Sequence, residues 1–184
     1  MLTSSKRIFF RFPGALSFIA LLTYFSIPVS IGAEGGQESL KIRPLVGSIY
    51  VSGQIGLAHL DAIKAQGFST LIDLRPDGES ADQTPSSEIK AVAASKGMRF
   101  FYVPVAPGPI PAGSVEKLQS LLAPEKVLLY CRSGSRATRT FALAQASRQG
   151  GPTRDEILSM ARSAGYSADD LRTEIERRIA QRKP

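Results

Sequence analysis

Residues 127–138 read VLLYCRSGSRAT and carry the clearest indication of the fold. It begins with an apolar run, 127–130, of the length and composition expected for a strand at the centre of a buried parallel sheet. Cys131 stands at the end of this run, and small polar residues lead from it to Arg136, just before a helical pattern over 137–147. The stretch therefore predicts a strand–loop–helix turn of an α/β protein.

Ligands of α/β proteins bind outside the carboxyl ends of the strands, where this loop is expected to lie. Its backbone amides and the following helix N-terminus favour an oxyanion such as phosphate or sulfate. The same field stabilises a thiolate, so we expect Cys131 to be a nucleophile and Arg136 to bind two oxygens of the ligand. The alternative is that Cys131 is a small buried apolar residue. The predicted anion-binding residues are Arg132, Ser133, Gly134 and Ser135.

The chain has one cysteine, Cys131, and one histidine, His59. These counts exclude an internal disulfide, a Cys/His zinc cluster and a CxxC redox pair. His59 lies between two leucines of a helical segment and is expected to be structural. The sequence implies no metal and no organic cofactor.

Strand-like and helix-like segments alternate along the chain from Leu40. We expect a central, mostly parallel sheet flanked by helices, followed by a C-terminal pair of helices. The first of that pair should open at Thr153, which begins a capping box, and the second at Ser167. The further expected strands are 49–51, 70–74 and 100–105, and the further expected helices are 57–65, 85–97 and 114–122.

The N-terminus has the pattern of a targeting segment: a short basic head, then 22 uncharged residues over 12–33. We expect residues 1–33 to be a cleaved signal peptide, with an uncleaved membrane anchor as the alternative. We expect residues 34–39 to form a flexible lead-in and residues 40–184 to form one phosphatase-like domain. Either reading places this domain in the periplasm or otherwise outside the cytoplasm. Only the uncleaved form would contact a membrane.

The formal net charge of the whole chain is +7. Three basic residues belong to this segment, so residues 34–184 carry a net charge of +4. The remaining basic residues are dispersed, with no basic stripe and no interleaved aromatic side chains. We therefore expect no nucleic-acid partner.

Four residues separate Cys131 from Arg136 in the segment CRSGSR (131–136). This spacing resembles that of the active loop of rhodanese-type sulfurtransferases. Tyrosine and dual-specificity phosphatases have five residues between the Cys and the Arg. The surrounding chain is instead similar to the bacterial family of phosphatase-like domains first described in beta-lactamase-hydrolase-like proteins. The stretches that carry this second resemblance are IYVSGQ (49–54), LIDLRPDGE (71–79) and YVPV (102–105). It covers about 40–165 and implies a cysteine-phosphatase fold.

The resemblance has one departure that bears on mechanism. Dual-specificity phosphatases usually carry a general-acid Asp in the loop that here spans 106–111, and this loop has no carboxylate. A phosphomonoester leaving group needs a proton. The nearest carboxylates in sequence are Asp77, Glu79 and Asp82; of these we assign the acid role to Asp77, with a simple Asp77–Gly78 turn as the alternative.

Three functions remain open, and the family resemblance favours the first. The first is a cysteine-dependent phosphatase-like hydrolase, with Cys131, Arg136 and Asp77 as catalytic residues. The second is a sulfurtransferase that carries sulfur as a Cys131 persulfide and needs no general acid. The third is a non-catalytic oxyanion-binding module. In each case the partner is a phosphate- or sulfur-containing molecule whose identity the sequence does not give.

Overall fold

The structure, a computed structural model, describes residues 40–182, and all of these belong to one compact unit. The predicted targeting segment 1–33 and the lead-in 34–39 lie outside the described residues. Between residues 40 and 182, no helix is both long and apolar enough to cross a membrane.

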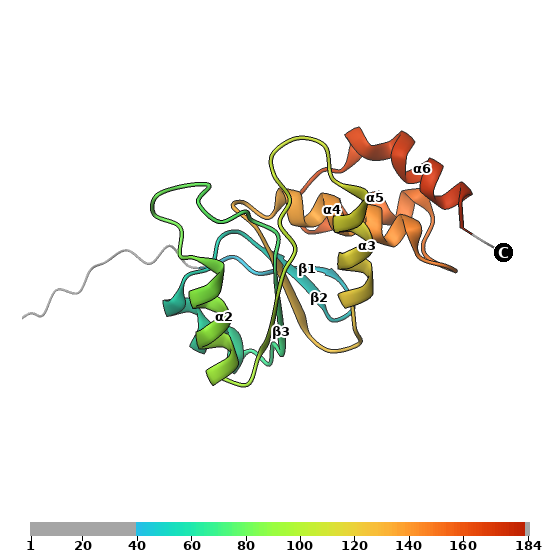
Figure 1. Cartoon of the computed structure of the whole chain (residues 1–184). Coiled ribbons are helices and arrows are strands. Elements are labelled where there is room, and N and C mark those ends of the chain that lie inside the picture. Colours follow the sequence, from blue (N-terminus) through green and yellow to red (C-terminus); the bar gives the residue numbers. More distant parts are fainter. Residues whose placement is uncertain (1–39, 183–184) are drawn as a thin grey trace, which may run out of the picture. The chain divides into compact units, whose positions relative to one another are not determined.

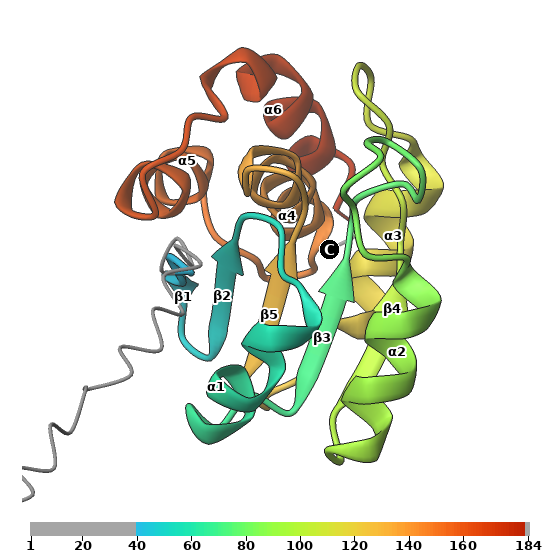
Figure 2. The ribbon, with the colours of Figure 1, turned by 90° about the vertical axis from the view of Figure 1, so that its left-hand side faces the viewer.

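The centre of the domain is a five-stranded sheet with the order β1-β2-β5-β3-β4 (Figure 2). Strands β2, β5, β3 and β4 are parallel, and only β1 at one edge is antiparallel to its neighbour β2. All carboxyl ends of the parallel strands therefore meet at one edge of the sheet. The strands are β1 (Arg43–Val46), β2 (Ile49–Ser52), β3 (Thr70–Asp73), β4 (Arg99–Tyr102) and β5 (Val127–Tyr130).

Helices cover both faces of the sheet, with α2 on one side and α3 to α6 on the other (Figure 1). Helix α4 packs against α3, α5 and α6, and α5 also contacts β1. The α-helices are α1 (Leu60–Ala65), α2 (Ser86–Ser95), α3 (Ala112–Leu121), α4 (Ser135–Ser147), α5 (Arg154–Ser163) and α6 (Arg172–Ala180), with short 3₁₀ turns at Leu57–His59 and Asp169–Leu171.

Two buried clusters fill the space between the sheet and its helices, and β5 contributes to both. Leu129 and Cys131 belong to the cluster under α3 to α6, whereas Leu128 and Tyr130 belong to the cluster under α1 and α2. This alternation is the side-chain period of a strand that is buried on both faces. It fixes the face of the sheet on which the sulfur of Cys131 lies.

The predicted fold is confirmed, with local differences. The capping box at Thr153 is present, since Thr153 accepts from the Glu156 amide and Glu156 accepts from the Thr153 amide. Strand β4 ends at Tyr102, three residues before the predicted end, and α4 begins at Ser135, two residues early. Strand β1 was not among the predicted strands.

Candidate active site

The loop between β5 and α4 places a backbone amide beside the sulfur of Cys131. Cys131 is fully buried, and the amide of Gly134 donates to its Sγ over 3.2 Å. Gly134 has φ = +93°, a left-handed conformation that L side chains rarely adopt. Its carbonyl oxygen accepts from both the amide and the hydroxyl of Thr138, at 3.0 and 2.9 Å, so the loop is tied to the first turn of α4.

Arg136 lies in that first turn and is held from two directions. Its Nη1 donates to the carbonyl oxygen of Val105 at 2.6 Å, and its Nη2 pairs with Oε2 of Glu79 at 2.7 Å. A guanidinium has five N–H donors, more than these two bonds require. Arg136 therefore combines a fixed position beside the Cys131 loop with donors for a bound oxyanion.

Glu79 is shared by two arginines. Its Oε2 also accepts from Nε of Arg75 at 2.8 Å, and Arg75 is only 4% exposed. The hydrogen bond from Arg136 lowers the pKa of the Glu79 carboxyl, with Arg75 adding to the effect against a smaller opposing effect of burial. Glu79 is therefore ionised at neutral pH and is unsuited to donate a proton.

The carboxylate of Asp77, predicted as the general acid, makes two hydrogen bonds to the start of a helix. Its two oxygens accept from the amide of Ser86 at 2.8 Å and from the hydroxyl of Ser86 at 2.6 Å, at the start of α2. Carboxylates at this position satisfy an otherwise unpaired helix amide and favour the positive end of the helix dipole. These bonds favour the alternative, structural role of Asp77, although its part in catalysis stays a prediction.

Two further aspartates lie near these residues. Asp82 is exposed, and its pKa is lowered mainly by the hydroxyl of Ser80. Asp73, at the end of β3, is buried; burial raises its pKa to about 7, against the hydrogen bond from the Arg75 amide. Its sheet partner is Tyr130, whose side chain belongs to the cluster opposite the one that contains Cys131. Asp73 is thus on the other side of the sheet from the sulfur.

The remaining predicted anion-binding residues line the outside of the loop. Arg132 and Ser133 are exposed, and Ser135 is half-buried. The carbonyl oxygen of Arg132 accepts from the amide of Gln54 at 3.1 Å. A Cβ atom at Gly53 would lie 3.3 Å from the same carbonyl oxygen, so the segment after β2 packs closely against the loop.

Sequence reasoning missed two contributors to this site. One is the carbonyl of Val105, which binds Arg136 although its residue type carries no chemical signal. The other is Tyr166, from the segment between α5 and α6, whose hydroxyl donates to the carbonyl of Ser133 at 2.9 Å. His59 is structural as expected, since its Nδ1 accepts from the amide of Gly56 at 2.9 Å.

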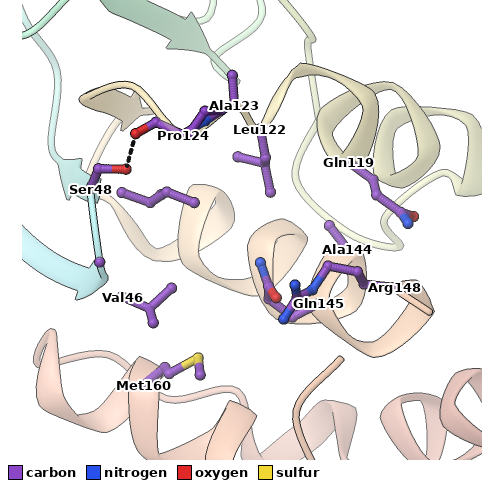
Figure 3. Close-up of a pocket in the computed structure, with 12 residues that line it drawn as sticks. Val46, Ser48, Gln119, Leu122, Ala123, Pro124, Ala144, Gln145, Arg148 and Met160 are labelled. Carbon is purple, nitrogen blue, oxygen red and sulfur yellow. Dashed lines mark hydrogen bonds between the residues drawn. The ribbon is translucent and has the colours of Figure 1, made fainter. Parts of the chain in front are cut away.

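A cavity of about 330 Å³, some of whose lining residues are shown in Figure 3, contains no residue of this loop. It is lined by residues that precede β2 and β5, such as Ser48 and Pro124, and by the end of α4, including Arg148. Since Cys131 follows β5, the cavity is at the opposite end of the sheet. In residues 40–182 no group of three or more His, Cys, Asp or Glu side chains is arranged to hold a metal ion.

The order of these motifs matches a known sequence family over residues 41–148, the phosphatase-like domain of beta-lactamase hydrolase-like proteins. The chain belongs to this family. A beta-lactamase hydrolase-like protein of Xylella fastidiosa (strain 9a5c) is 29% identical over 144 residues, which make up 77% of this chain and 33% of that protein. The chain thus matches about a third of the length of this relative.

Solved structures agree with the family. A candidate phosphatase of Neisseria meningitidis is 30% identical, with a TM-score of 0.65 over 74% of this chain and 97% of that one. A kinase-associated phosphatase, solved with its catalytic-site cysteine replaced by serine, has a TM-score of 0.60 at 12% identity, over 77% of this chain and 96% of that one. The fold is therefore that of the cysteine phosphatases.

Proposed function

We propose that this chain is a cysteine-dependent phosphatase in which Cys131 is the nucleophile. The observation that carries the proposal is the hydrogen bond from the Gly134 amide to the buried sulfur, with Arg136 held in the first turn of the helix that follows. Donors that are preorganised around a nucleophile in this way stabilise charge that develops in the transition state. The family and the fold support the same chemistry.

In the first step, the thiolate of Cys131 attacks phosphorus. The S–P bond forms as the P–O bond to the leaving group breaks, and the leaving oxygen departs as an anion that takes its proton from water. The loop amides and the guanidinium of Arg136 hold the equatorial oxygens. In the second step, water attacks the thiophosphate, inorganic phosphate leaves and the thiolate is restored.

Sulfur transfer is the second candidate, and the four-residue spacing between Cys131 and Arg136 favours it. The thiolate would attack the outer sulfur of a thiosulfate-like donor, release sulfite and hold the sulfur as a persulfide. A thiophilic acceptor such as cyanide would then remove it. This route requires no general acid.

A paired assay of the purified chain separates these candidates. We expect phosphate release from an aryl phosphate, abolished in Cys131→Ser and reduced by a hundredfold or more in Arg136→Lys, because lysine cannot bind two oxygens with a planar fork. Thiocyanate formation from thiosulfate and cyanide without phosphate release would instead establish sulfur transfer. If neither substrate is converted while phosphate or sulfate raises the melting temperature, the site is a binding module.

We further propose that the domain acts outside the cytoplasm, because residues 1–33 have the pattern of a secretory signal. Cell fractionation followed by N-terminal sequencing tests this. A mature chain that begins at Glu34 in the periplasmic fraction is expected, and an intact chain in the membrane fraction would identify an anchor. Recovery of the intact chain in the cytoplasm would contradict export.

A further inference from the structure

Tyr166 reaches the Cys131 loop from a part of the chain that the family match does not include. It follows α5, beyond the end of the match at residue 148, and its hydroxyl donates to the carbonyl oxygen of Ser133 at 2.9 Å. The contact is close, since a Cβ atom at Gly134 would overlap the hydroxyl of Tyr166. Gly134 is therefore required both by its backbone conformation and by the position of this phenol.

The two hydrogen bonds at this loop share one peptide group. The carbonyl of Ser133 accepts from Tyr166, and the N–H at the other end of the same planar unit, that of Gly134, donates to Sγ of Cys131. We propose that Tyr166 is a positioning residue that orients the Ser133–Gly134 peptide so that its N–H faces the sulfur of Cys131. The proposal rests on the proposed function, in that Cys131 is taken to react as a thiolate.

This orientation matters because the opposite one would be repulsive. If the Ser133–Gly134 peptide turned over, its carbonyl oxygen would face the thiolate and any bound oxyanion, and one donor would be lost. A hydroxyl bonded to that carbonyl opposes the rotation. Hydrogen bonds in a chain also polarise one another, so the bond from Tyr166 strengthens the donor at Gly134.

The ring of Tyr166 is held in place by Arg43. The guanidinium carbon of Arg43 lies 5.9 Å from the centre of the Tyr166 ring, and Nη1 of Arg43 donates to the carbonyl of Ala164 at 3.3 Å. Gly165 has φ = +78°, and a Cβ atom there would overlap the guanidinium of Arg43. Burial raises the pKa of Tyr166, which outweighs the opposing effect of Arg43, so the phenol remains a donor at neutral pH.

Thiol ionisation tests this role directly. Cys131 is the only cysteine, so the ultraviolet absorbance of its thiolate can be titrated against pH in the full chain, with a Cys131→Ser background for each variant. In Tyr166→Phe we expect the midpoint of thiolate formation to rise by about 0.5–1 pH unit. A shift of this size corresponds to weakening one hydrogen bond to a charged group. The kcat for an aryl phosphate should fall more than KM changes.

Tyr102→Phe is the matched control, because the hydroxyl of Tyr102 also makes one bond to the backbone, to the amide of Asp77. Its thiol midpoint should equal that of the unmodified chain. The proposal is overturned if the midpoint of thiolate formation in Tyr166→Phe is unchanged or lower. With a reduced melting temperature as well, that result would give Tyr166 a structural role only. Since the readout is ionisation, it holds even if the chain hydrolyses no phosphate ester.

A second measurement covers the case in which Tyr166→Phe does not fold. In the unmodified chain, the NMR resonances of the Gly134 amide and of the Tyr166 ring should both titrate with the midpoint of the thiol, because one peptide couples them. Resonances of Tyr166 that do not follow the thiol titration would overturn the proposal.

Discussion

The guanidinium of Arg136 and the carboxylate of Glu79 form an ion pair of 2.7 Å between the β5–α4 turn and the segment after β3, and each side chain is 14% exposed. Arg75 binds the same carboxylate oxygen. Two cations thus share one anion, and the anion holds the arginine that we propose binds the oxyanion.

Removing the negative charge of Glu79 should therefore lower both the activity and the stability. We expect Glu79→Gln to lower kcat/KM for an aryl phosphate by about tenfold to a hundredfold, because two partly buried guanidinium groups lose their shared counter-charge. Steady-state kinetics and thermal unfolding would measure both consequences. Glu116→Gln, at an exposed carboxylate of α3 outside the first turn of that helix, is the control and should change neither. Full activity in Glu79→Gln would show that Arg136 needs no such support.

The reaction should be sensitive to the leaving group. Residues 106–111 include no carboxylate, and the carboxylates of Asp77 and Glu79 are engaged elsewhere. Without a positioned acid, kcat/KM should fall steeply across aryl phosphates as the pKa of the departing phenol rises. A shallow dependence that becomes steep in Asp82→Asn would contradict this expectation and identify Asp82 as the acid.

Asp77→Asn separates the acid role of Asp77 from its structural one. Asparagine keeps one acceptor oxygen for Ser86 but loses the charge at the start of α2. We expect kcat to fall by less than threefold and the stability to fall by about 0.5–1 kcal/mol. The pH–rate profile and chemical denaturation provide these values. Loss of kcat by a hundredfold together with loss of the basic limb of the pH profile would restore Asp77 as general acid.

Asp73 should make stability depend on pH. Its pKa is raised from 3.8 to about 7, so between these values the native state binds a proton that the unfolded chain has lost, and stability falls as pH rises through this window. Asp73→Asn removes the effect. Urea unfolding should show the unmodified chain losing about 2–3 kcal/mol more than this variant between about pH 5 and pH 8.

Glu116→Gln, at an exposed carboxylate of α3, controls for general changes in charge, and its pH dependence should match that of the unmodified chain. Parallel pH profiles for the unmodified chain and Asp73→Asn would mean that Asp73 is ionised in the native state throughout this range.

The sequence predicted the part of the site that is local in the chain. An apolar run followed by Cys131, small residues and Arg136 describes one continuous turn, and the structure has that turn. The edge strand β1 escaped prediction because it is short, contains Pro44 and buries only Leu45, so neither its length nor its pattern stands out. An edge strand needs little of the regularity that a central strand requires.

The contacts of the site could not be predicted, because they join distant segments. Asp77 and Glu79 are two residues apart in a turn, and only the packing shows that Glu79 faces Arg136 while Asp77 faces α2. Tyr166 belongs to no motif that the sequence analysis could recognise. Its position depends on how α5 packs against β1 and α4, which no local pattern encodes.

The packing of α5 and α6 bears on where a shortened version of this protein could end. Side chains of both helices, among them Ile157, Leu158 and Ile175, are at most 1% exposed and share one core with Val51 and Leu129 of the sheet. Each such side chain contributes about 1.5–3 kcal/mol, so losing three would remove much of the 5–15 kcal/mol that typically stabilises a domain. A fragment cut at residue 148, where the match to the family model ends, should therefore aggregate or be degraded rather than yield a minimal phosphatase-like domain.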